Sequence, residues 1–197
     1  MYLSFRIKLS LVFYLITQTN PIMKKLSFLF TLLALTFVSA SVFAQLTKEQ
    51  VITEWKRAKV YTKAYLDAMP ADGYTFKATP EIRTFAQQML HLTDANYYFG
   101  SVVNGKPSPM GKASAEKTVE QTKEATTKAV MEGYDYMISV IENTPADQMQ
   151  TMVTAEGQKV TKALLLSKAF EHQTHHRGQT TIYLRLKGVT PPGEMLF

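Results

Sequence analysis

Apolar positions recur every three or four residues over most of the chain after residue 46, a spacing typical of helices that bury one face. The first such stretch opens on Thr47, which forms a capping-box pattern with Gln50, and stops before Pro70. We therefore predict a first helix over residues 47–69. Its buried face is expected to comprise Val51, Trp55, Ala58, Thr62, Tyr65 and Met69.

A second helix is predicted to open at Thr79-Pro80-Glu81, because proline suits the first helical position and an acidic residue suits the first turn. It is expected to end near Gly100 or Gly105. Its main stripe comprises Phe85, Met89, Leu92 and Asn96, with His91 on the flank.

Residues 104–112 contain two prolines and two glycines and are predicted to form a linker. Ser114 then caps a third helix that we expect to run to Asn143. Residues 146–160 are predicted to make a short extended excursion, and a fourth helix is predicted from Thr161 to Gly188. The apolar positions of the third helix are Val130, Tyr134, Met137, Val140 and Ile141.

Four long helices with short or modest connections predict an all-α four-helix bundle, one domain over residues 45–197. The buried seam of the fourth helix is predicted to advance by four and three residues in turn. That seam comprises Leu165, Ala169, His172, His176, Gln179, Tyr183 and Leu186.

Residues 1–44 are predicted to be a leader. Lys24 and Lys25, the apolar run 26–38 and a small-x-small site at 42–44 together form a secretory signal. The apolar run is short and no cationic stop-transfer cluster follows it, which favours cleavage over a membrane anchor. We expect a periplasmic or secreted protein that begins at Gln45. Residues 1–22 are best explained by a start codon placed too far upstream, with Met23 the true initiator.

Charge and cysteine content narrow the function classes. The whole chain carries a net charge of +6, but four of the positive charges (Arg6, Lys8, Lys24 and Lys25) lie in the leader, which leaves +2 for the mature part. This balance gives no support for nucleic-acid binding, which needs a clustered basic face. The chain contains no cysteine, so any reacting thiol must come from a substrate.

Three of the four histidines fall within five residues, at His172, His175 and His176. On a helix, His172 and His176 are separated by about 40° around the axis and roughly 6 Å along it, so both imidazoles can reach one ion. With His91 available from another helix, the pattern indicates a metal site. His175 falls at the edge of the stripe and is interpreted as a solvated flank residue, with support of the metal ligands as the alternative.

A last helix with H-x-x-x-H-R-G-Q, followed by G-x-x-P-P, resembles the DinB/YfiT family of metal-binding four-helix bundles. The matching residues are His172, His176, Arg177, Gly178 and Gln179, then Gly188, Pro191 and Pro192, with His91 in the segment QMLHLTDANYYFG. The resemblance implies a divalent metal held by His91, His172 and His176 with an open coordination position. It also implies homodimers, and relatives that include thiol-dependent transferases.

Three neutral imidazoles leave the double charge of the ion exposed, where it lowers the pKa of bound water or of a substrate thiol. Zinc is the first expectation and nickel the second, and imidazole also accepts iron or manganese. Two function classes stay open: an exported transferase-like or hydrolase-like metalloenzyme acting on a small molecule, and a non-catalytic metal-binding or ligand-sensing dimer. A cavity leading to the metal favours the first, and a fourth protein ligand favours the second.

Four residues close in sequence to the histidines are assigned supporting roles. Asp94 is a candidate to orient His91 or act as a base, although a structural role is favoured. Gln179 is a candidate to hydrogen-bond a metal-bound water, with core packing as the equal alternative. Arg177 is expected to form an interhelical ion pair, and Gly178 to let another helix approach closely.

Tyrosines are plentiful in the mature part, and one four-helix core is not expected to bury them all. We therefore predict an exposed aromatic face that pairs two copies of the chain. The tyrosines considered are Tyr61, Tyr65, Tyr97, Tyr98, Tyr134, Tyr136 and Tyr183.

Overall fold

A computed structural model describes residues 21–22, 25–26, 28–30 and 46–197. The chain divides into two units, Met1–Leu46 and Thr47–Phe197. In the first unit the described residues between 21 and 30 are helical, while most of the predicted signal sequence and its cleavage site before Gln45 lie outside the described residues. Among the residues that are described, no helix combines the length and the apolar character needed to cross a membrane.

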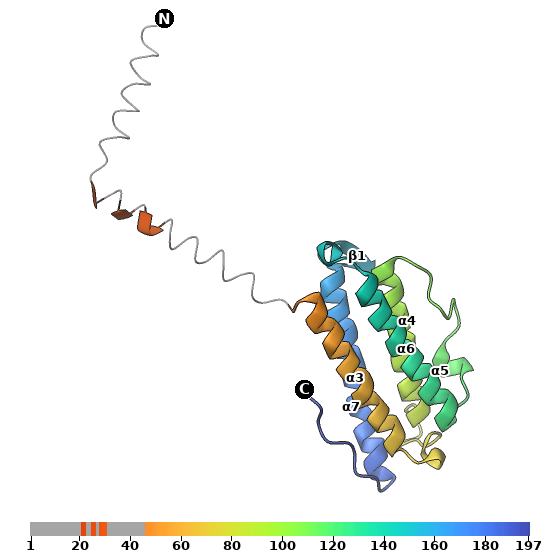
Figure 1. Ribbon diagram of the computed structural model, residues 1–197. Coiled ribbons are helices and arrows are strands. Elements are labelled where there is room, and N and C mark those ends of the chain that lie inside the picture. The colour runs from red at the N-terminus through yellow and green to blue at the C-terminus, as the bar shows by residue number, and fades with distance from the viewer. Residues whose placement is uncertain (1–20, 23–24, 27, 31–45) are drawn as a thin grey trace, which may run out of the picture. The chain divides into compact units, whose positions relative to one another are not determined.

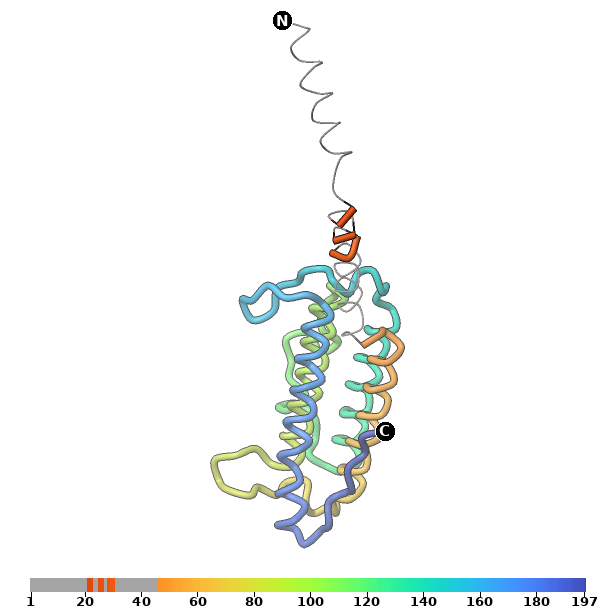
Figure 2. Tube along the Cα trace, turned by 90° about the vertical axis from the view of Figure 1, so that its left-hand side faces the viewer, coloured from red at the N-terminus to blue at the C-terminus, as the bar shows by residue number. Residues whose placement is uncertain are grey.

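Four long helices build the second unit, which confirms the all-α four-helix bundle (Figures 1 and 2). They are α3 (Lys48–Ala68), α4 (Phe85–Asn104), α6 (Lys123–Asn143) and α7 (Lys162–Leu186). Helix α4 packs against α6 and α7, and α3 packs against the same two helices. Shorter elements are η1 (Ala71–Gly73), α5 (Ala115–Thr118) and η2 (Ala146–Gln148).

The extended excursion before the last helix is a hairpin of β1 (Met152–Ala155) and β2 (Gln158–Thr161). Its antiparallel register pairs Met152 with Thr161 and Ala155 with Gln158. Glu156 and Gly157 form the turn with φ of 50° and 77°, the left-handed conformation that a two-residue hairpin loop requires. The Tyr98 hydroxyl accepts a hydrogen bond from the Glu156 backbone N–H at 3.1 Å, which joins the hairpin to α4.

The predicted apolar stripes of α3, α4 and α6 face one core. Trp55 is fully buried and packs edge-on against Tyr134 and Phe170, with ring centroids 5.9 and 5.6 Å apart. Phe85, Met89, Leu92 and Asn96 of α4 are buried, as are Val130, Tyr134, Met137, Val140 and Ile141 of α6. The sequence periodicity therefore located the core correctly on these three helices.

The predicted start of the second helix is wrong by five residues. Thr79 to Ile82 form a turn, and α4 begins only after Thr84. Thr84 and Gln87 form a reciprocal capping box, in which each side chain accepts a hydrogen bond from the other residue's backbone N–H. This pair satisfies two backbone donors at the helix start, an advantage that the proline signal upstream lacks.

The predicted third helix is interrupted. Helix α5 ends at Thr118, Val119 is extended, and Thr122 starts α6 by accepting a hydrogen bond from the Ala125 backbone N–H at 3.2 Å. Thr122 followed by Glu124 is an ordinary helix-start pattern, so a second cap was readable within the segment. Because of this break, α5 is a separate short helix that does not continue into α6.

The predicted seam of α7 is only partly correct. Gln179 and Leu186 are exposed, whereas Gln173, Arg177 and Thr180 are buried. A seam with a period of 3.5 residues drifts by about 20° per seven residues on a straight helix, so its later members leave the core. The buried set on α7 is Leu165, Leu166, Ala169, Gln173, His176, Arg177, Thr180, Tyr183 and Leu184.

Arg177 does not form the predicted ion pair: no carboxylate of the described residues bridges it. Its guanidinium lies 4.2 Å from the centre of the Tyr61 ring and donates to Gln173 Oε1 at 3.0 Å. Tyr134 donates to the same Gln173 oxygen at 2.7 Å, so a cation–π contact and a buried amide replace the carboxylate. Burial lowers the pKa of Arg177 from its ordinary value.

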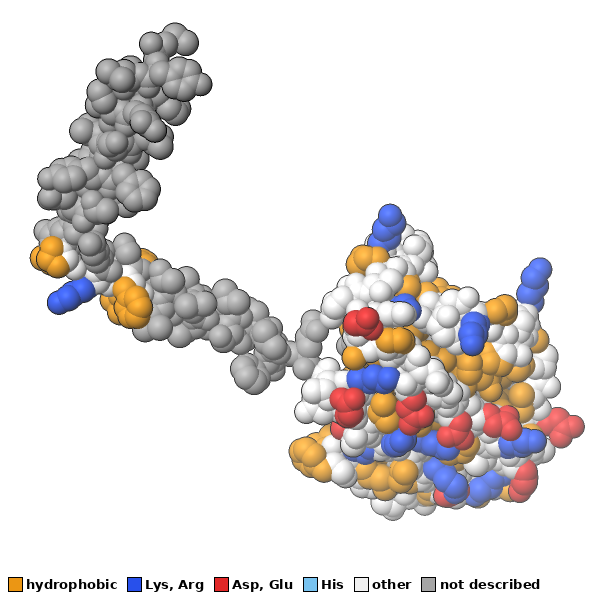
Figure 3. All heavy atoms as spheres, turned by 45° about the horizontal axis from the view of Figure 1, so that its top comes forward, with side chains coloured by type: hydrophobic (Ala, Val, Ile, Leu, Met, Phe, Trp, Pro, Cys, Tyr) orange, Lys and Arg blue, Asp and Glu red, His pale blue; other side chains and the backbone are white. Residues whose placement is uncertain are grey.

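The expectation of unburied tyrosines is largely wrong. Tyr61, Tyr65, Tyr97, Tyr134 and Tyr183 are buried, Tyr136 is half-buried, and Tyr98 is 37% exposed. Helices α3 and α7 instead expose large aliphatic side chains, among them Val60, Ile182 and Leu186. On the face shown in Figure 3, acidic and basic side chains are intermixed over the helical unit. The tyrosine count thus gives no argument for a dimer.

Close helix approach occurs at Gly133 rather than at Gly178. A Cβ added to Gly133 of α6 would lie 2.9 Å from Cγ2 of Thr93 on α4, whereas one added to Gly178 meets no atom within 4 Å. Thr93 is β-branched and fully buried, so it has little freedom to move aside. Gly133 therefore lets α4 and α6 pack closely, as does Gly100 of α4, where an added Cβ would lie 2.5 Å from the Tyr136 ring of α6.

We predict that Gly133→Val lowers the free energy of unfolding by about 1–3 kcal/mol through overpacking. The same substitution at Gly178 is the matched control and should change stability by less than about 0.5 kcal/mol, because valine and glycine have similar helix propensities. Urea denaturation followed by circular dichroism measures both. Equal losses at the two sites would contradict the packing argument.

Candidate metal centre

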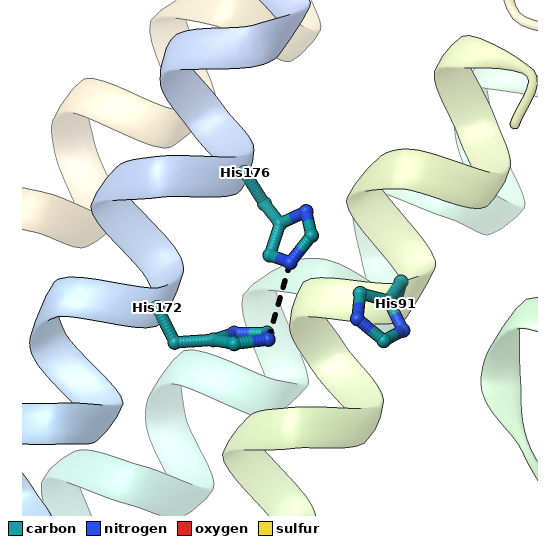
Figure 4. A group of neighbouring side chains, drawn as sticks. All are labelled: His91, His172 and His176. Carbon is teal, nitrogen blue, oxygen red and sulfur yellow. Dashed lines mark hydrogen bonds between the residues drawn. The ribbon is translucent and has the colours of Figure 1, made fainter. Parts of the chain in front are cut away.

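His91, His172 and His176 converge between α4 and α7 (Figure 4). One ring nitrogen from each lies within 4.8 Å of the others. His172 and His176 stand one turn apart on α7, and their Nε2 atoms are 3.1 Å apart. His91 comes from α4, with its ring centre 4.6 Å from that of His176 and 5.3 Å from that of His172.

The spacing fits a single divalent ion. Two nitrogens bound at about 2.0–2.1 Å to one ion lie roughly 3.0 Å apart at a right angle and about 3.4 Å apart at the tetrahedral angle. The distance of 3.1 Å between His172 and His176 falls in this interval. One nitrogen of His91 lies within 4.8 Å of the other two, so an ion bound by all three would require the His91 ring to lie closer to the pair.

Burial keeps the three imidazoles neutral. His176 is 8% exposed, and burial followed by the nearby His172 and His91 lowers its pKa to about 3. Burial and then His91 lower the pKa of His172 to about 4, and burial also lowers the pKa of His91. Neutral imidazole is the form that binds metal ions, so the cluster needs no deprotonation at neutral pH.

A carboxylate supports His91. Nδ1 of His91 lies 3.3 Å from Glu116 Oε2, and Arg83 Nε donates to the other oxygen of Glu116 at 2.9 Å. A carboxylate at Nδ1 places the imidazole hydrogen there and leaves Nε2 free to bind an ion. Sequence analysis did not identify Glu116, because the break between α5 and α6 was not foreseen.

Asp94 has the structural role. Its carboxylate accepts hydrogen bonds from the Ser114 hydroxyl at 2.6 Å and from the backbone N–H groups of Ala115 and Glu116 at 2.6 and 3.1 Å. It therefore fixes the start of α5 on α4. Asp94 thereby positions Glu116, and its negative charge also acts on His91, in the direction that raises the pKa of His91.

Two glutamines support His176. The Gln88 amide nitrogen lies 2.9 Å from His176 Nδ1 and also donates to Gln179 Oε1. Gln179 Nε2 lies 3.1 Å from Nε2 of His175, which is exposed on the flank as predicted. Gln179 thus points to Gln88 and His175. Gln88 follows Thr84 by one turn at the start of α4 and was not identified from the sequence.

A cavity of about 450 Å³ adjoins the cluster. It lies between α4 and residues 108–116, and His91 and Glu116 form part of its wall. Tyr97, Tyr98 and Ser101 supply aromatic and hydroxyl groups, and Arg83 supplies the basic one. Its volume suits a small organic molecule.

Sequence and structure comparisons assign the family. The DinB family profile matches residues 41–195, which include all three histidines of the cluster. The chain belongs to the DinB family. The resemblance carried by His172, His176, Arg177, Gly178 and Gln179 is thereby confirmed.

Two uncharacterized proteins of Bacillus subtilis are similar in sequence to this DinB-family chain. The uncharacterized protein YjoA of Bacillus subtilis is 22% identical over 145 residues, which cover 72% of this chain and 91% of YjoA. The uncharacterized protein YrdA of the same species is 40% identical over 45 residues, covering 23% of this chain and 27% of YrdA.

Solved structures share the fold. A DinB-like protein from Bacillus cereus ATCC 10987 has a TM-score of 0.66 at 20% identity and covers 74% of this chain and 96% of its own. A conserved protein from Enterococcus faecalis has a TM-score of 0.60 at 16% identity, covering 73% and 98%. At these identities the likeness concerns the fold alone.

The metal-free protein is predicted to lose stability as the pH falls below about 6.5. Unfolded histidine takes up a proton near pH 6.5, whereas the pKa of folded His176 is about 3. Between these values the unfolded state binds more protons, so stability is complete above pH 6.5 and declines toward pH 3. His176→Asn should flatten this decline between pH 6.5 and 5 in thermal unfolding. An unchanged slope would contradict the assigned pKa.

Proposed function

We propose that this chain is an exported DinB-family protein that binds a divalent metal through His91, His172 and His176 and uses it in a transferase-like or hydrolase-like reaction on a small molecule. The observation that carries the proposal is the cavity of about 450 Å³ whose wall includes His91. A ligand in this cavity would lie beside the cluster. Zinc is the favoured metal because its preferred ligands include imidazole, with nickel, iron and manganese as alternatives.

The donor set favours an enzyme over a structural metal site. Structural zinc sites are usually closed by four protein ligands. Within the described part of the chain, the cluster comprises three histidines and no carboxylate. Glu116 lies on the Nδ1 side of His91, where it supports a ligand instead of adding one. This set supports a site with a coordination position left for water or substrate.

When bound, a divalent ion held by three neutral imidazoles supplies Lewis acidity and lowers the pKa of a thiol or water that binds it. The residues of the chain provide the environment. Glu116 and Gln88 hold two of the ligands in place, and the Tyr97 and Tyr98 rings form a wall on which an apolar part of the substrate packs. Because the chain has no cysteine, a thiol nucleophile would be a substrate.

Export and dimerisation belong to the same proposal. Lys24, Lys25 and the apolar run 26–38 support a cleavable signal, and a periplasmic or secreted location follows from it. The family resemblance supports a homodimer. The exposed aliphatic side chains Val60, Ile182 and Leu186 on α3 and α7 are available to such an interface.

We predict that His91→Ala, His172→Ala and His176→Ala each abolish stoichiometric metal binding, because two imidazoles hold an ion far more weakly than three. His175→Ala is the matched control on the same helix and should retain most of the metal. Elemental analysis of protein purified without a histidine tag measures the metal content. If His175→Ala loses as much metal as His176→Ala, the choice of ligands is wrong.

The cavity is predicted to bind the substrate. Ala113→Phe should fill part of it, lowering metal-dependent turnover at least tenfold while the metal content stays unchanged. The matched control is Ala146→Phe in η2, an exposed alanine outside the cavity lining. Turnover is measured with a chromogenic acetate ester and with glutathione plus chlorodinitrobenzene, before and after metal removal. Rates that do not depend on the metal would favour the non-catalytic alternative.

The mature protein is predicted to begin at Gln45, since a small-x-small site precedes it. N-terminal sequencing of protein recovered from the periplasm or medium of an expressing bacterium measures this. Recovery of a chain that retains residues 1–22 would overturn both the cleavage site and the proposed initiator Met23.

A further inference from the structure

The two ring nitrogens of His176 face different partners. Nε2 lies in the cluster, 3.1 Å from His172 Nε2, and Nδ1 lies 2.9 Å from the Gln88 amide nitrogen. A neutral imidazole has one hydrogen for its two nitrogens, so the group opposite Nδ1 decides where that hydrogen is. Gln88 is only 5% exposed, so its amide determines which nitrogen of His176 carries the hydrogen.

The Gln88 amide can face His176 in two ways. As it lies in the structure, Nε2–H of Gln88 donates to Nδ1, and His176 carries its hydrogen on Nε2, which donates to His172. This arrangement suits a metal-free pair, because His176 Nε2 then has no lone pair for an ion. A half-turn of the amide presents Oε1 to Nδ1, and the imidazole hydrogen then occupies Nδ1 and leaves Nε2 ready to bind.

Gln88 does not turn alone. Its amide nitrogen also donates to Gln179 Oε1, and Gln179 Nε2 lies 3.1 Å from His175 Nε2. When Gln88 presents its oxygen, Gln179 must turn as well, so that its Nε2 donates to that oxygen. Gln179 Oε1 then accepts from Nε2–H of His175. His176, Gln88, Gln179 and His175 thus form one chain of hydrogen bonds, and all of its donors and acceptors can exchange roles together.

The supports of the other two histidines do not offer this choice. Glu116 and Arg83 both face Nδ1 of His91, at 3.3 and 3.4 Å, but a carboxylate only accepts hydrogen bonds and a guanidinium only donates them, so neither changes its role by turning. Nδ1 of His172 is buried and has no hydrogen-bond partner among the described residues. Within that part of the chain, the tautomer of His176 is the one that an amide can set either way.

We propose that Gln88 and Gln179 are positioning residues that set the tautomer of His176, and that cation binding reverses the hydrogen-bond chain out to the exposed His175. The inference rests on the proposed function, in which this cluster binds a divalent cation. It assigns to Gln179 a role that differs from bonding a metal-bound water.

Two charge-matched variants test the proposal. Gln88→Glu places an acceptor-only group at Nδ1 and should bind Zn²⁺ at least as tightly as the unmodified protein. Gln179→Glu accepts from the Gln88 amide nitrogen, holds the metal-free direction, and should weaken Zn²⁺ binding about tenfold. Competition with a chromophoric chelator measures both affinities. Each variant adds one negative charge near the site, so tighter binding by both would show that charge alone acts and would overturn the proposal.

Nitrogen-15 NMR of the imidazoles in the metal-free protein provides a readout that needs no metal. His176 should carry its hydrogen on Nε2 in the unmodified protein and in Gln179→Glu, and on Nδ1 in Gln88→Glu. An unchanged tautomer in Gln88→Glu would overturn the proposal. If the unmodified protein binds no Zn²⁺, the proposed function fails, and the tautomers still decide the role of Gln88.

Gln173→Met controls for the loss of a buried amide. Gln173 is fully buried on α7, and its amide contacts Tyr134, Arg177 and its own helix without touching a histidine. It should lower the melting temperature and leave the Zn²⁺ affinity unchanged, whereas Gln88→Met should lower the affinity at least tenfold. Equal affinities for Gln88→Met and the unmodified protein would overturn the proposal.

Discussion

The packing of α4 against α7 sets the distances from His91 to His172 and His176, because His91 comes from α4 and the other two ligand candidates come from α7. Polar contacts fix how the two helices lie along each other. The Tyr183 hydroxyl donates to the backbone oxygen of Arg83 at 2.7 Å, and Gln88 reaches His176 at 2.9 Å. The Phe85 and Tyr183 rings add an apolar contact, 6.4 Å between centres. A shift of either helix by one residue would remove all of these contacts together.

Much of this arrangement follows from the sequence. Capping residues and apolar spacing locate α3, most of α4 and the second half of the third predicted helix, since these signals act within a few residues. The pair His172 and His176 is readable for the same reason, because one helical turn brings the rings together whatever the rest of the fold does. His91 is different. Its place opposite the pair depends on tertiary packing, and it was identified from the family resemblance.

The residues that support the cluster could not be predicted from such local sequence signals. Glu116 reaches His91 only because the chain breaks at Val119 and Asp94 anchors the start of α5. Gln88 contacts His176 across two helices, and a glutamine one turn after a helix cap has no distinctive pattern. Arg177 was predicted to form an ion pair, but its guanidinium contacts the uncharged Tyr61 ring. The spacing of charged residues along the sequence does not indicate such a contact. These contacts depend on which helix faces which, and sequence periodicity does not specify that.

The hairpin between α6 and α7 is a part of the fold that can vary in sequence while the helix bundle is kept. Tyr98 lines the cavity and holds the Glu156 backbone through its hydroxyl, so the turn of the hairpin is joined to the cavity wall. Residues of a hairpin turn can change in length and composition while the four helices keep their packing. Selection on residues 152–161 can therefore reshape what enters the cavity without altering the histidines. Members of one family can in this way keep a common helix bundle while the wall of the cavity diverges.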